Sequence, residues 1–288
     1  MTMSSEKKLR AKPIIKQVYA NLQHTIEKKQ LKPCLVIIIL GNDPAAVYYM
    51  NNLRKKGAKI GIEVKIEKLD TSISQEALIS KIDQFNSNSE IHGIMLQKPL
   101  PKHIDEVEIV MKIAPDKDVD GFHPLNMGKL VLNQDSLLPS TPAAVLKILD
   151  FYNIKTEGKN VVILGRSAIV GKPLANLLLR KDSPGNATVT VCHSRTQHLA
   201  NITSQADILV AAIGKANFVK KEMIKQEAII IDVGVNQIED AETGYKYLGD
   251  VDYNDCFEKA AKITPVPGGV GSVTTSMLLS NVVKAALK

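Results

Sequence analysis

The chain has little of several residue types that mark particular protein classes. Its 288 residues contain no tryptophan, and aromatic residues make up only 4%. Cysteine is also scarce, because only Cys34, Cys192 and Cys256 occur, far apart and without a Cys-x-x-Cys pair. This spacing argues against both a disulfide framework and a zinc site. It is typical of a protein of the reducing cytoplasm.

A long apolar run is missing as well. The most apolar segment, CLVIIIL at 34–40, is far shorter than the roughly 20 residues of a membrane-spanning helix and is typical of a buried strand. The N-terminal stretch MTMSSEKKLRAK lacks the apolar core and cleavage site of a signal peptide. A transit peptide is the alternative, but we interpret its basic residues as the approach to the first helix. We therefore expect no membrane association.

Positive charge exceeds negative charge, but it forms no arm. Lysine and arginine number 37 against 30 acidic residues, which gives a formal net charge of +7 spread over many predicted helices. No basic-aromatic platform or RNA-binding signature is present, so we expect no nucleic-acid partner. A small polyanionic ligand would exploit the same field. With 44% hydrophobic residues, the chain can bury a sizeable core.

Strand and helix patterns alternate along the chain, which predicts an α/β protein with two parallel sheets. The predicted strands are CLVIIIL, EVKIEKL and HGIMLQ in the first half, and NVVILG, ATVTVC, DILVAA and AIIIDVG in the second. The first predicted helix is amphipathic, with Ile14, Val18, Leu22 and Ile26 on one face, and the second begins near Asp43-Pro44. Further helices are predicted at about 75–85, 106–113, 170–179 and 272–288. Residues 115–142 break the pattern and predict a loop-rich boundary or site.

The stretch NVVILGRSAIVGKPLANLLL places a glycine-containing turn between a strand and a helix, where a pyrophosphate would meet backbone N–H groups. Gly165 matches the first glycine of the dinucleotide fingerprint, Ser167 takes the second place, and the third glycine is shifted to Gly171. A tight strand–helix turn explains the match almost as well. The next strand ends without an acid for a ribose 2′-hydroxyl. Arg166 and Arg195 would suit a 2′-phosphate, which favours NADP, unless they are plain surface cations.

Three further loops are candidates for a substrate site: GIMLQKPLP, DKDVDGFHP and ITPVPGGVGSVTT. The second places Asp116, Asp118 and Asp120 in a turn beside His123, and the third is flexible enough for close backbone approach. Each alone is explained by ordinary turn chemistry. The insertion of Lys117 and the lack of a calcium-loop pattern argue against a metal in the acidic turn.

These stretches, taken together, resemble one family. LQKPLP, DKDVDGFHP, GRSAIVGKP, NATVTVCHSRT, IDVGVN, GDVDY and ITPVPGGVG occur in the order found in the bifunctional methylenetetrahydrofolate dehydrogenase / methenyltetrahydrofolate cyclohydrolase family. The resemblance extends from LRAKPI to the C-terminal helix, which is almost the whole chain. So many motifs in order make it specific.

The resemblance implies two α/β domains with the active site in the cleft between them. Residues 1–142 plus 271–288 would form the folate-binding catalytic domain, and residues 143–270 a Rossmann-type NADP-binding domain. It implies a homodimeric enzyme of one-carbon metabolism that oxidises 5,10-methylenetetrahydrofolate with NADP. Many members then hydrolyse the methenyl product to 10-formyltetrahydrofolate.

The resemblance also implies roles for individual residues. Asp120 would hold the pterin by its hydrogen-bonding edge, Tyr49 would pack against the ligand, and Gln97 would orient the catalytic base. The remaining folate-cleft residues carry over to Pro267, Gly268 and Gly271. The NADP residues carry over to Gly165, Arg166, Ser167, Ser194 and Val235.

The chain departs from the family at the catalytic base. The family carries Tyr-x-x-x-Lys on the helix after the first strand, but here Leu53 follows Tyr49 by four residues. Aligning on Tyr48 instead places Asn52 there. Lys98 stands where the family usually has leucine, and Lys56 lies three residues beyond Leu53. Ser140, and the run Gly271-Ser272-Val273-Thr274, also depart from the family's pattern.

Three readings follow from this departure. The first is an NADP-dependent methylenetetrahydrofolate dehydrogenase whose cyclohydrolase step is weak, because Leu53 has no ionisable atom. In the second, Lys56 or Lys98 substitutes as base and the enzyme is fully bifunctional. In the third, the chain is a non-catalytic NADP- or folate-binding homologue. An oxidoreductase acting on another small carbonyl or amine is a further alternative. The intact Gln97, Asp120 and GRS turn favour the dehydrogenase.

Overall fold

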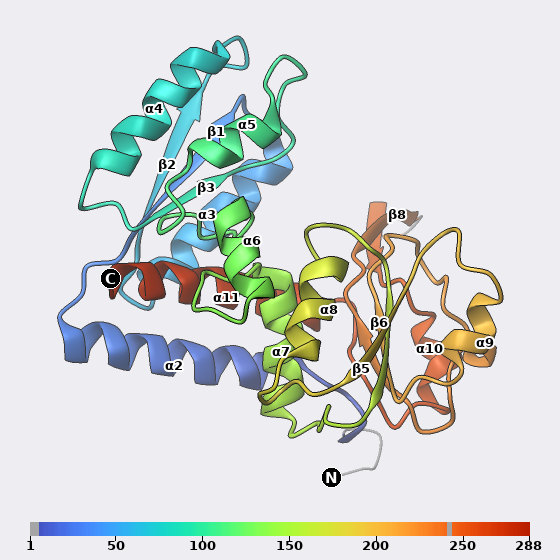
Figure 1. Ribbon diagram of the computed structural model, residues 1–288. Coiled ribbons are helices and arrows are strands. Elements are labelled where there is room, and N and C mark those ends of the chain that lie inside the picture. Colours follow the sequence, from blue (N-terminus) through green and yellow to red (C-terminus); the bar gives the residue numbers. More distant parts are fainter. Residues whose placement is uncertain (1–5, 241–243) are drawn as a thin grey trace. The chain divides into compact units, whose positions relative to one another are not determined.

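The computed structural model describes residues 6–240 and 244–288. The chain divides into two compact units (Figure 1). Unit 1 comprises the chain up to Lys16 and Thr141–Thr274, and unit 2 comprises Gln17–Ser140 and Thr275–Lys288. The first segment belongs to unit 1 because Leu9 donates its N–H to the carbonyl of Ile263 at 2.9 Å. The assignment of folate and NADP to separate domains stays a prediction.

Unit 2 is built on a three-stranded parallel sheet in the order β2-β1-β3. Its strands are β1 (Cys34–Leu40), β2 (Glu63–Leu69) and β3 (Gly93–Leu96). Its helices are α3 (Pro44–Ala58), α4 (Gln75–Ser87), α5 (Glu106–Lys112) and α6 (Pro124–Val131). Figure 1 shows α4 and α5 close together, and their apolar side chains form one core cluster with β1 and β3. Strand β1 is buried throughout, as its continuous apolar sequence predicts.

Unit 1 contains a five-stranded parallel sheet in the order β10-β7-β6-β4-β5. Its strands are β4 (Asn160–Leu164), β5 (Thr188–Cys192), β6 (Ile208–Ala211), β7 (Ile229–Asp232) and β10 (Lys262–Ile263). Its helices are α8 (Gly171–Leu179), α9 (Leu199–Thr203), α10 (Tyr253–Phe257) and the 3-10 turn η1 (Lys221–Met223). The chain passes from β4 to β5 and then returns past β4 to β6. This reversal creates a crevice at the carboxyl ends of β4 and β6, where doubly wound sheets bind ligands.

Three helices lie at the boundaries of the units in sequence. Helix α2 (Ala11–Lys29) begins in unit 1 and continues into unit 2, and α11 (Val270–Ala286) does the same at the other end of the chain. Helix α7 (Ser140–Phe151) begins at the boundary itself. The four apolar residues that predicted the first helix are all buried on α2. Within the described residues, no helix combines the length and apolar character required to cross a bilayer.

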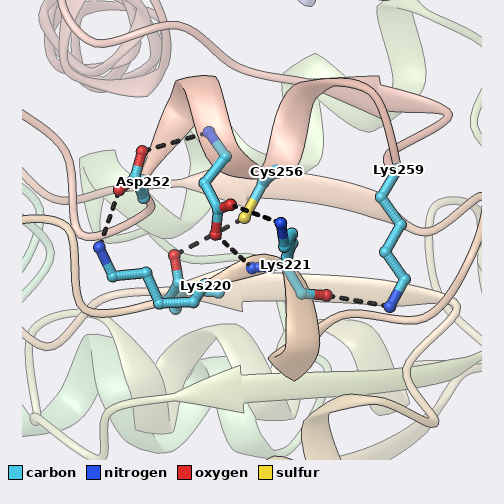
Figure 2. A network of polar contacts seen from close by, with 7 residues as sticks. Lys220, Lys221, Asp252, Cys256 and Lys259 are labelled. Atoms are coloured by element: carbon cyan, nitrogen blue, oxygen red, sulfur yellow. Dashed lines mark hydrogen bonds and ion pairs between the residues drawn. The ribbon is translucent and has the colours of Figure 1, made fainter.

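A polar network fixes the outer part of unit 1 (Figure 2). The Lys220 ammonium pairs with the Asp252 carboxylate at 2.8 Å, and the Lys259 ammonium donates to the carbonyl of Lys221 at 2.9 Å. The buried thiol of Cys256 contacts the carbonyl of Val219 at 3.6 Å, and burial raises the pKa of Cys256 to about 12. This cysteine is therefore a packing residue that joins α10 to the segment before η1.

Two elements differ from the sequence-based expectation. Residues 115–142 are not loop throughout, because α6 forms there with His123 Nδ1 accepting from the N–H of Leu125 at 3.0 Å. The antiparallel pair β8 (Asn236–Asp240) and β9 (Gly244–Leu248) was not predicted. Its strands are largely exposed and contain no apolar run, so their sequence carries no strand signal.

Candidate active-site residues

The turn between β4 and α8 requires glycine at two positions. Gly165 has φ +121°, and a Cβ there would meet the carbonyl oxygen of Ala212 at 2.2 Å. A Cβ on Gly171 would meet the carbonyl oxygen of Gly165 at 2.0 Å. The shifted third glycine therefore allows close packing of the helix start against the turn. Ser167 Oγ accepts from the N–H of Val170 at 3.1 Å and orders the residues between the glycines.

A cavity of about 320 Å³ opens at this turn, at the carboxyl ends of β4, β5 and β6. It is lined by Leu164, Gly165, Arg166, Ser167, Cys192, His193, Ser194, Leu199, Ala212, Ile213, Lys215 and Phe218. Four of the five predicted NADP residues therefore share one cavity. No side chain caps the first turn of α8, which leaves the positive end of the helix open to an anion.

Sequence reasoning missed Lys215, a second cation in this lining. Its ammonium lies 5.8 Å from the centre of the Phe218 ring. Its backbone is fixed by Asp250, a fully buried residue whose carboxylate accepts from the N–H groups of Ile213, Gly214 and Lys215 at 2.7–3.0 Å. The aspartate of GDVDY thus shapes one wall of the cavity. Lys215 follows the apolar strand at the same sheet edge as Arg166, which is the signal that could have identified it.

The fifth predicted NADP residue lies elsewhere in unit 1. Val235 lines a cavity of about 230 Å³ together with Pro267, Gly268 and Gly271, which were predicted to contact folate. Asp232 lies at the base of this cavity, and its carboxylate accepts backbone N–H groups of Gly234, Asp250 and Val251. Burial raises the pKa of Asp232 to about 7, against the lowering effect of those bonds. These three folate candidates therefore belong to unit 1.

In unit 2, helix α3 begins as its sequence predicts. Asp43 is the N-cap and accepts from the N–H of Ala46 at 2.7 Å, with Pro44 at the first helical position. Of the two tyrosines, Tyr48 is 72% exposed and Tyr49 only 36%. Burial, together with the nearby negative charge of Asp120, raises the pKa of Tyr49 to about 12. Tyr49 is therefore the tyrosine that lies near the predicted folate residue.

Leu53, at the place of the family's lysine, is a core residue. It is 1% exposed and shares the buried face of α3 with Met50 and Gly57. Lys56, one turn on, is half-buried, and burial lowers its pKa. Desolvation favours the neutral amine, which is the form that accepts a proton.

The three aspartates of the acidic turn lie in different environments. Asp116 is exposed and pairs with Lys288. Asp118 is buried, and its carboxylate accepts from the N–H of His123 at 2.7 Å and from Asn126 at 3.0 Å. Burial and the charge of Asp118 raise the pKa of Asp120 to about 7, and Lys98 opposes this shift. Asp120 is the one whose charge state changes near neutral pH.

The backbone around Asp120 is held from two sides. Gly121 has φ +74°, and a Cβ there would meet the backbone of Leu138 and Pro139 at 2.6 Å. The side-chain amide of Asn281, on α11, donates to the carbonyls of Val119 and Leu138 at 2.8 Å each. Sequence reasoning missed Asn281, because nothing local connects it to a loop far away in the chain.

Gln97 and Lys98 line a cavity of about 480 Å³ at the carboxyl end of β1 and β3, with Gly41, Asn42 and Asp43 opposite. The Gln97 amide nitrogen donates to the carbonyl of Lys98 at 2.8 Å, which fixes the orientation of the amide. Its carbonyl oxygen Oε1 is buried and has no hydrogen-bond partner within residues 6–240 and 244–288. A buried acceptor without a donor is costly, and it marks a place for an N–H or O–H group.

Lys98 is engaged by two neighbours. Its ammonium lies 2.5 Å from the Glu106 carboxylate and 5.3 Å from the centre of the Phe122 ring. Both contacts hold the amino group, so it is not free to turn toward a substrate. Between the two lysines considered as substitute bases, this environment favours Lys56.

Two family profiles together cover most of the chain. Residues 9–120 match the catalytic domain of tetrahydrofolate dehydrogenase/cyclohydrolase, and residues 139–288 match its NAD(P)-binding domain. The bifunctional protein FolD of Bacillus pumilus is 49% identical over 261 residues, covering 91% of this chain and 89% of that protein.

Solved structures agree with the profiles. The bifunctional FolD methylenetetrahydrofolate dehydrogenase/cyclohydrolase of Campylobacter jejuni has a TM-score of 0.91 at 40% identity, covering 97% of this chain and 98% of that one. The Trypanosoma brucei methylenetetrahydrofolate dehydrogenase-cyclohydrolase, complexed with NADP and an inhibitor, has a TM-score of 0.87 at 38% identity, covering 96% and 94%. The chain belongs to the tetrahydrofolate dehydrogenase/cyclohydrolase family.

Proposed function

We propose that this protein oxidises 5,10-methylenetetrahydrofolate to 5,10-methenyltetrahydrofolate with NADP. The observation that carries the proposal is the Gly165 turn, which opens at the sheet crevice of a chain of this family. A side chain at Gly165 would collide with the carbonyl of Ala212, so glycine lets this turn pack against the end of β6. The same turn lines the cavity in which a pyrophosphate would be bound. When bound, NADP supplies the acceptor for the hydride of the substrate's methylene carbon.

The residues present fit NADP. The backbone of Gly165, Arg166 and Ser167 would bind the phosphates beside the open end of α8. Arg166 and Ser194 would hold the 2′-phosphate, with charge-assisted bonds from the guanidinium. Val235 would contact the cofactor from its separate cavity. Lys215 adds a second cation to the lining and strengthens the case for a phosphate over a bare ribose.

The folate roles are carried over from the family, and the environments of the side chains support them. An ionised Asp120 would accept hydrogen bonds from the pterin edge, and Tyr49 would pack against the ring. The negative charge of Asp120 also favours the positive charge that hydride loss leaves on the substrate. Pro267, Gly268 and Gly271 would offer backbone contacts to the ligand. The work of these residues is orientation, because hydride transfer needs an aligned methylene carbon.

The hydrolytic second step is expected to be slow. Water attack on the methenyl carbon needs a group that accepts a proton, and Leu53 has none. Gln97 Oε1, which would orient such a base, has no donor among the residues that the structure describes. This supports the loss of the base at position 53. Lys56 is the favoured substitute, because burial lowers its pKa, whereas Lys98 is engaged in an ion pair with Glu106.

The test is reduction of NADP followed by absorbance, with methylenetetrahydrofolate as substrate. Reduction at a rate that saturates with both ligands supports the proposal. Tight binding of NADP and folate without reduction would instead identify a non-catalytic homologue. Binding of NADP without folate would point to an oxidoreductase with another substrate.

The assembly and location of the protein are proposed from the family and the composition. We infer a cytoplasmic homodimer that associates with neither membrane nor nucleic acid. The three cysteines are free and buried, which fits a reducing compartment. Light scattering after size-exclusion chromatography would test the dimer, because a monomer of 31.5 kDa is readily distinguished from twice that mass.

A further inference from the structure

A cation and an apolar side chain have exchanged places in unit 2. Where the family carries lysine this chain has Leu53, and where the family usually carries leucine it has Lys98. The structure gives the two positions opposite environments. Leu53 is enclosed in the core face of α3, whereas Lys98 lines a cavity beside Gln97. The positive charge is therefore present in unit 2, but on the loop after β3.

The contacts of Lys98 direct its charge toward the acidic turn. Its ammonium lies over the ring of Phe122 at 5.3 Å, and Phe122 follows Asp120 by two residues in that turn. The ion pair with Glu106 at 2.5 Å fixes the ammonium from the other side. A lysine held by both a ring and a carboxylate loses the freedom of a solvated side chain.

The charged groups that bear on Asp120 come from three elements. Asp118, in the same turn, opposes ionisation of Asp120, and Lys98 favours it. From α3, the Tyr49 hydroxyl stays neutral, because its pKa is raised to about 12. Two lysines near the C-terminus are engaged elsewhere, since Lys284 of α11 pairs with Asp135, and Lys288, beyond the helix, pairs with Asp116. Lys98 is thus the cation that opposes the raising effect of burial and of Asp118 on the pKa of Asp120.

We propose that Lys98 is a positioning residue that holds the Asp120 carboxylate in its charged form and so sets the pH range in which unit 2 binds the pterin of folate. The inference rests on the proposed function, because Asp120 is the pterin ligand there. It also explains why a lysine is tolerated in this cavity without acting as a base. The ion pair with Glu106 keeps Lys98 in place.

Charges near Asp120 set the pH midpoint of folate binding. Asp120 titrates at about pH 7, so binding that needs its charge is complete above that value and is lost below it. Lys98→Leu removes the stabilising cation and moves the midpoint upward. Glu106→Gln keeps an acceptor for the ammonium but removes the charge that offsets it. This second variant moves the midpoint downward.

The experiment measures the Kd of 5-formyltetrahydrofolate, a folate that does not react, by calorimetry from pH 5.5 to 8.5. Lys98→Leu, which restores the family's residue, is expected to raise the midpoint by roughly half to one pH unit. Binding then weakens roughly three- to tenfold at pH 6 and hardly changes at pH 8.5. A merely structural role would weaken binding equally at both values. Lys98→Arg keeps the charge and should retain the midpoint.

Exposed Lys102, four residues along the same loop, provides the control, and Lys102→Ala should leave the midpoint in place. Carbon-13 NMR of labelled aspartate reports the midpoint of Asp120 in the free protein, with its signal assigned by its loss in Asp120→Asn. This readout is independent of activity and of folate binding. If it moves in Lys98→Leu although no folate binds, the proposed function fails and the electrostatic role of Lys98 stands. An unmoved Asp120 midpoint in Lys98→Leu overturns the inference.

Discussion

The side-chain amide of Asn281 donates 2.8 Å hydrogen bonds to the carbonyl of Val119, immediately before Asp120, and to the carbonyl of Leu138. These bonds join the acidic turn to the segment that closes around Gly121. The position of Asp120 thus depends on a residue of the last helix. Gly121 lies where the acidic turn approaches the backbone of Leu138 and Pro139 most closely, and the Asn281 amide bridges the same two segments by hydrogen bonds.

Asn281→Ala is expected to destabilise the protein and weaken folate binding together. The change leaves two buried carbonyls without a donor, which costs about 1–3 kcal/mol for each group. Chemical denaturation measures the free energy of unfolding, and calorimetry with folate measures binding. Asn21→Ala, on the exposed surface of α2, is the control. Unchanged stability and binding in Asn281→Ala would show that the acidic turn keeps its conformation without the Asn281 hydrogen bonds.

Arg166→Ala is expected to narrow a preference for NADP over NAD. The lost charge-assisted bonds to the 2′-phosphate correspond to about 1.5–3 kcal/mol in the ratio of kcat/KM for the two cofactors. Arg195→Ala is the comparison, because Arg195 is also exposed beside Ser194. Equal efficiency with both cofactors in the unmodified protein, or a larger effect from Arg195, would contradict the assignment.

Asp120→Asn is expected to abolish the pH dependence of folate binding near neutrality. Its pKa of about 7 means that the carboxylate gains charge as the pH rises through this value, so folate affinity rises over the same range. The amide has no charge to gain, and its binding should be weak and flat with pH. The Kd for NADP serves as the internal control, because the cavity proposed to bind NADP lies in unit 1. Undiminished folate turnover in Asp120→Asn would show that Asp120 shapes the turn and does not bind folate.

The sequence predicted features whose causes are local. Asp43-Pro44 marks a helix start because the cap and the proline act within one turn, and the structure confirms it. The buried strands were predicted by their apolar runs for the same reason. Helix α6 was missed because it is short and capped by His123, and histidine is not among the usual N-cap residues. The exposed pair β8 and β9 has no burial to leave a pattern.

The candidate site could be predicted only as a set of residues. Without the family resemblance, which singles out Asp120, the three aspartates of one turn look equivalent in the sequence. Their different environments become visible only through partners such as Lys288 for Asp116 and Asn126 for Asp118. Lys98 was a plausible base until its pairing with Glu106 was known. Such distinctions depend on contacts between segments that are distant in the chain, and a single sequence does not record them.

The last prediction is that Leu53→Lys increases hydrolysis of methenyltetrahydrofolate, which the unmodified protein should perform slowly. A lysine at this position would supply the proton acceptor, which typically contributes ~10²–10⁴-fold. Leu53 is buried, so circular dichroism must first show that the variant folds. Leu53→Met, which keeps the volume without an ionisable atom, is the matched control and should stay slow. The assay follows loss of methenyl absorbance against the buffer rate, and Lys56→Ala tests whether residual hydrolysis comes from that amine. Fast hydrolysis by the unmodified protein that survives both Lys56→Ala and Lys98→Ala would mean that no lysine is needed, and the explanation based on Leu53 would fail.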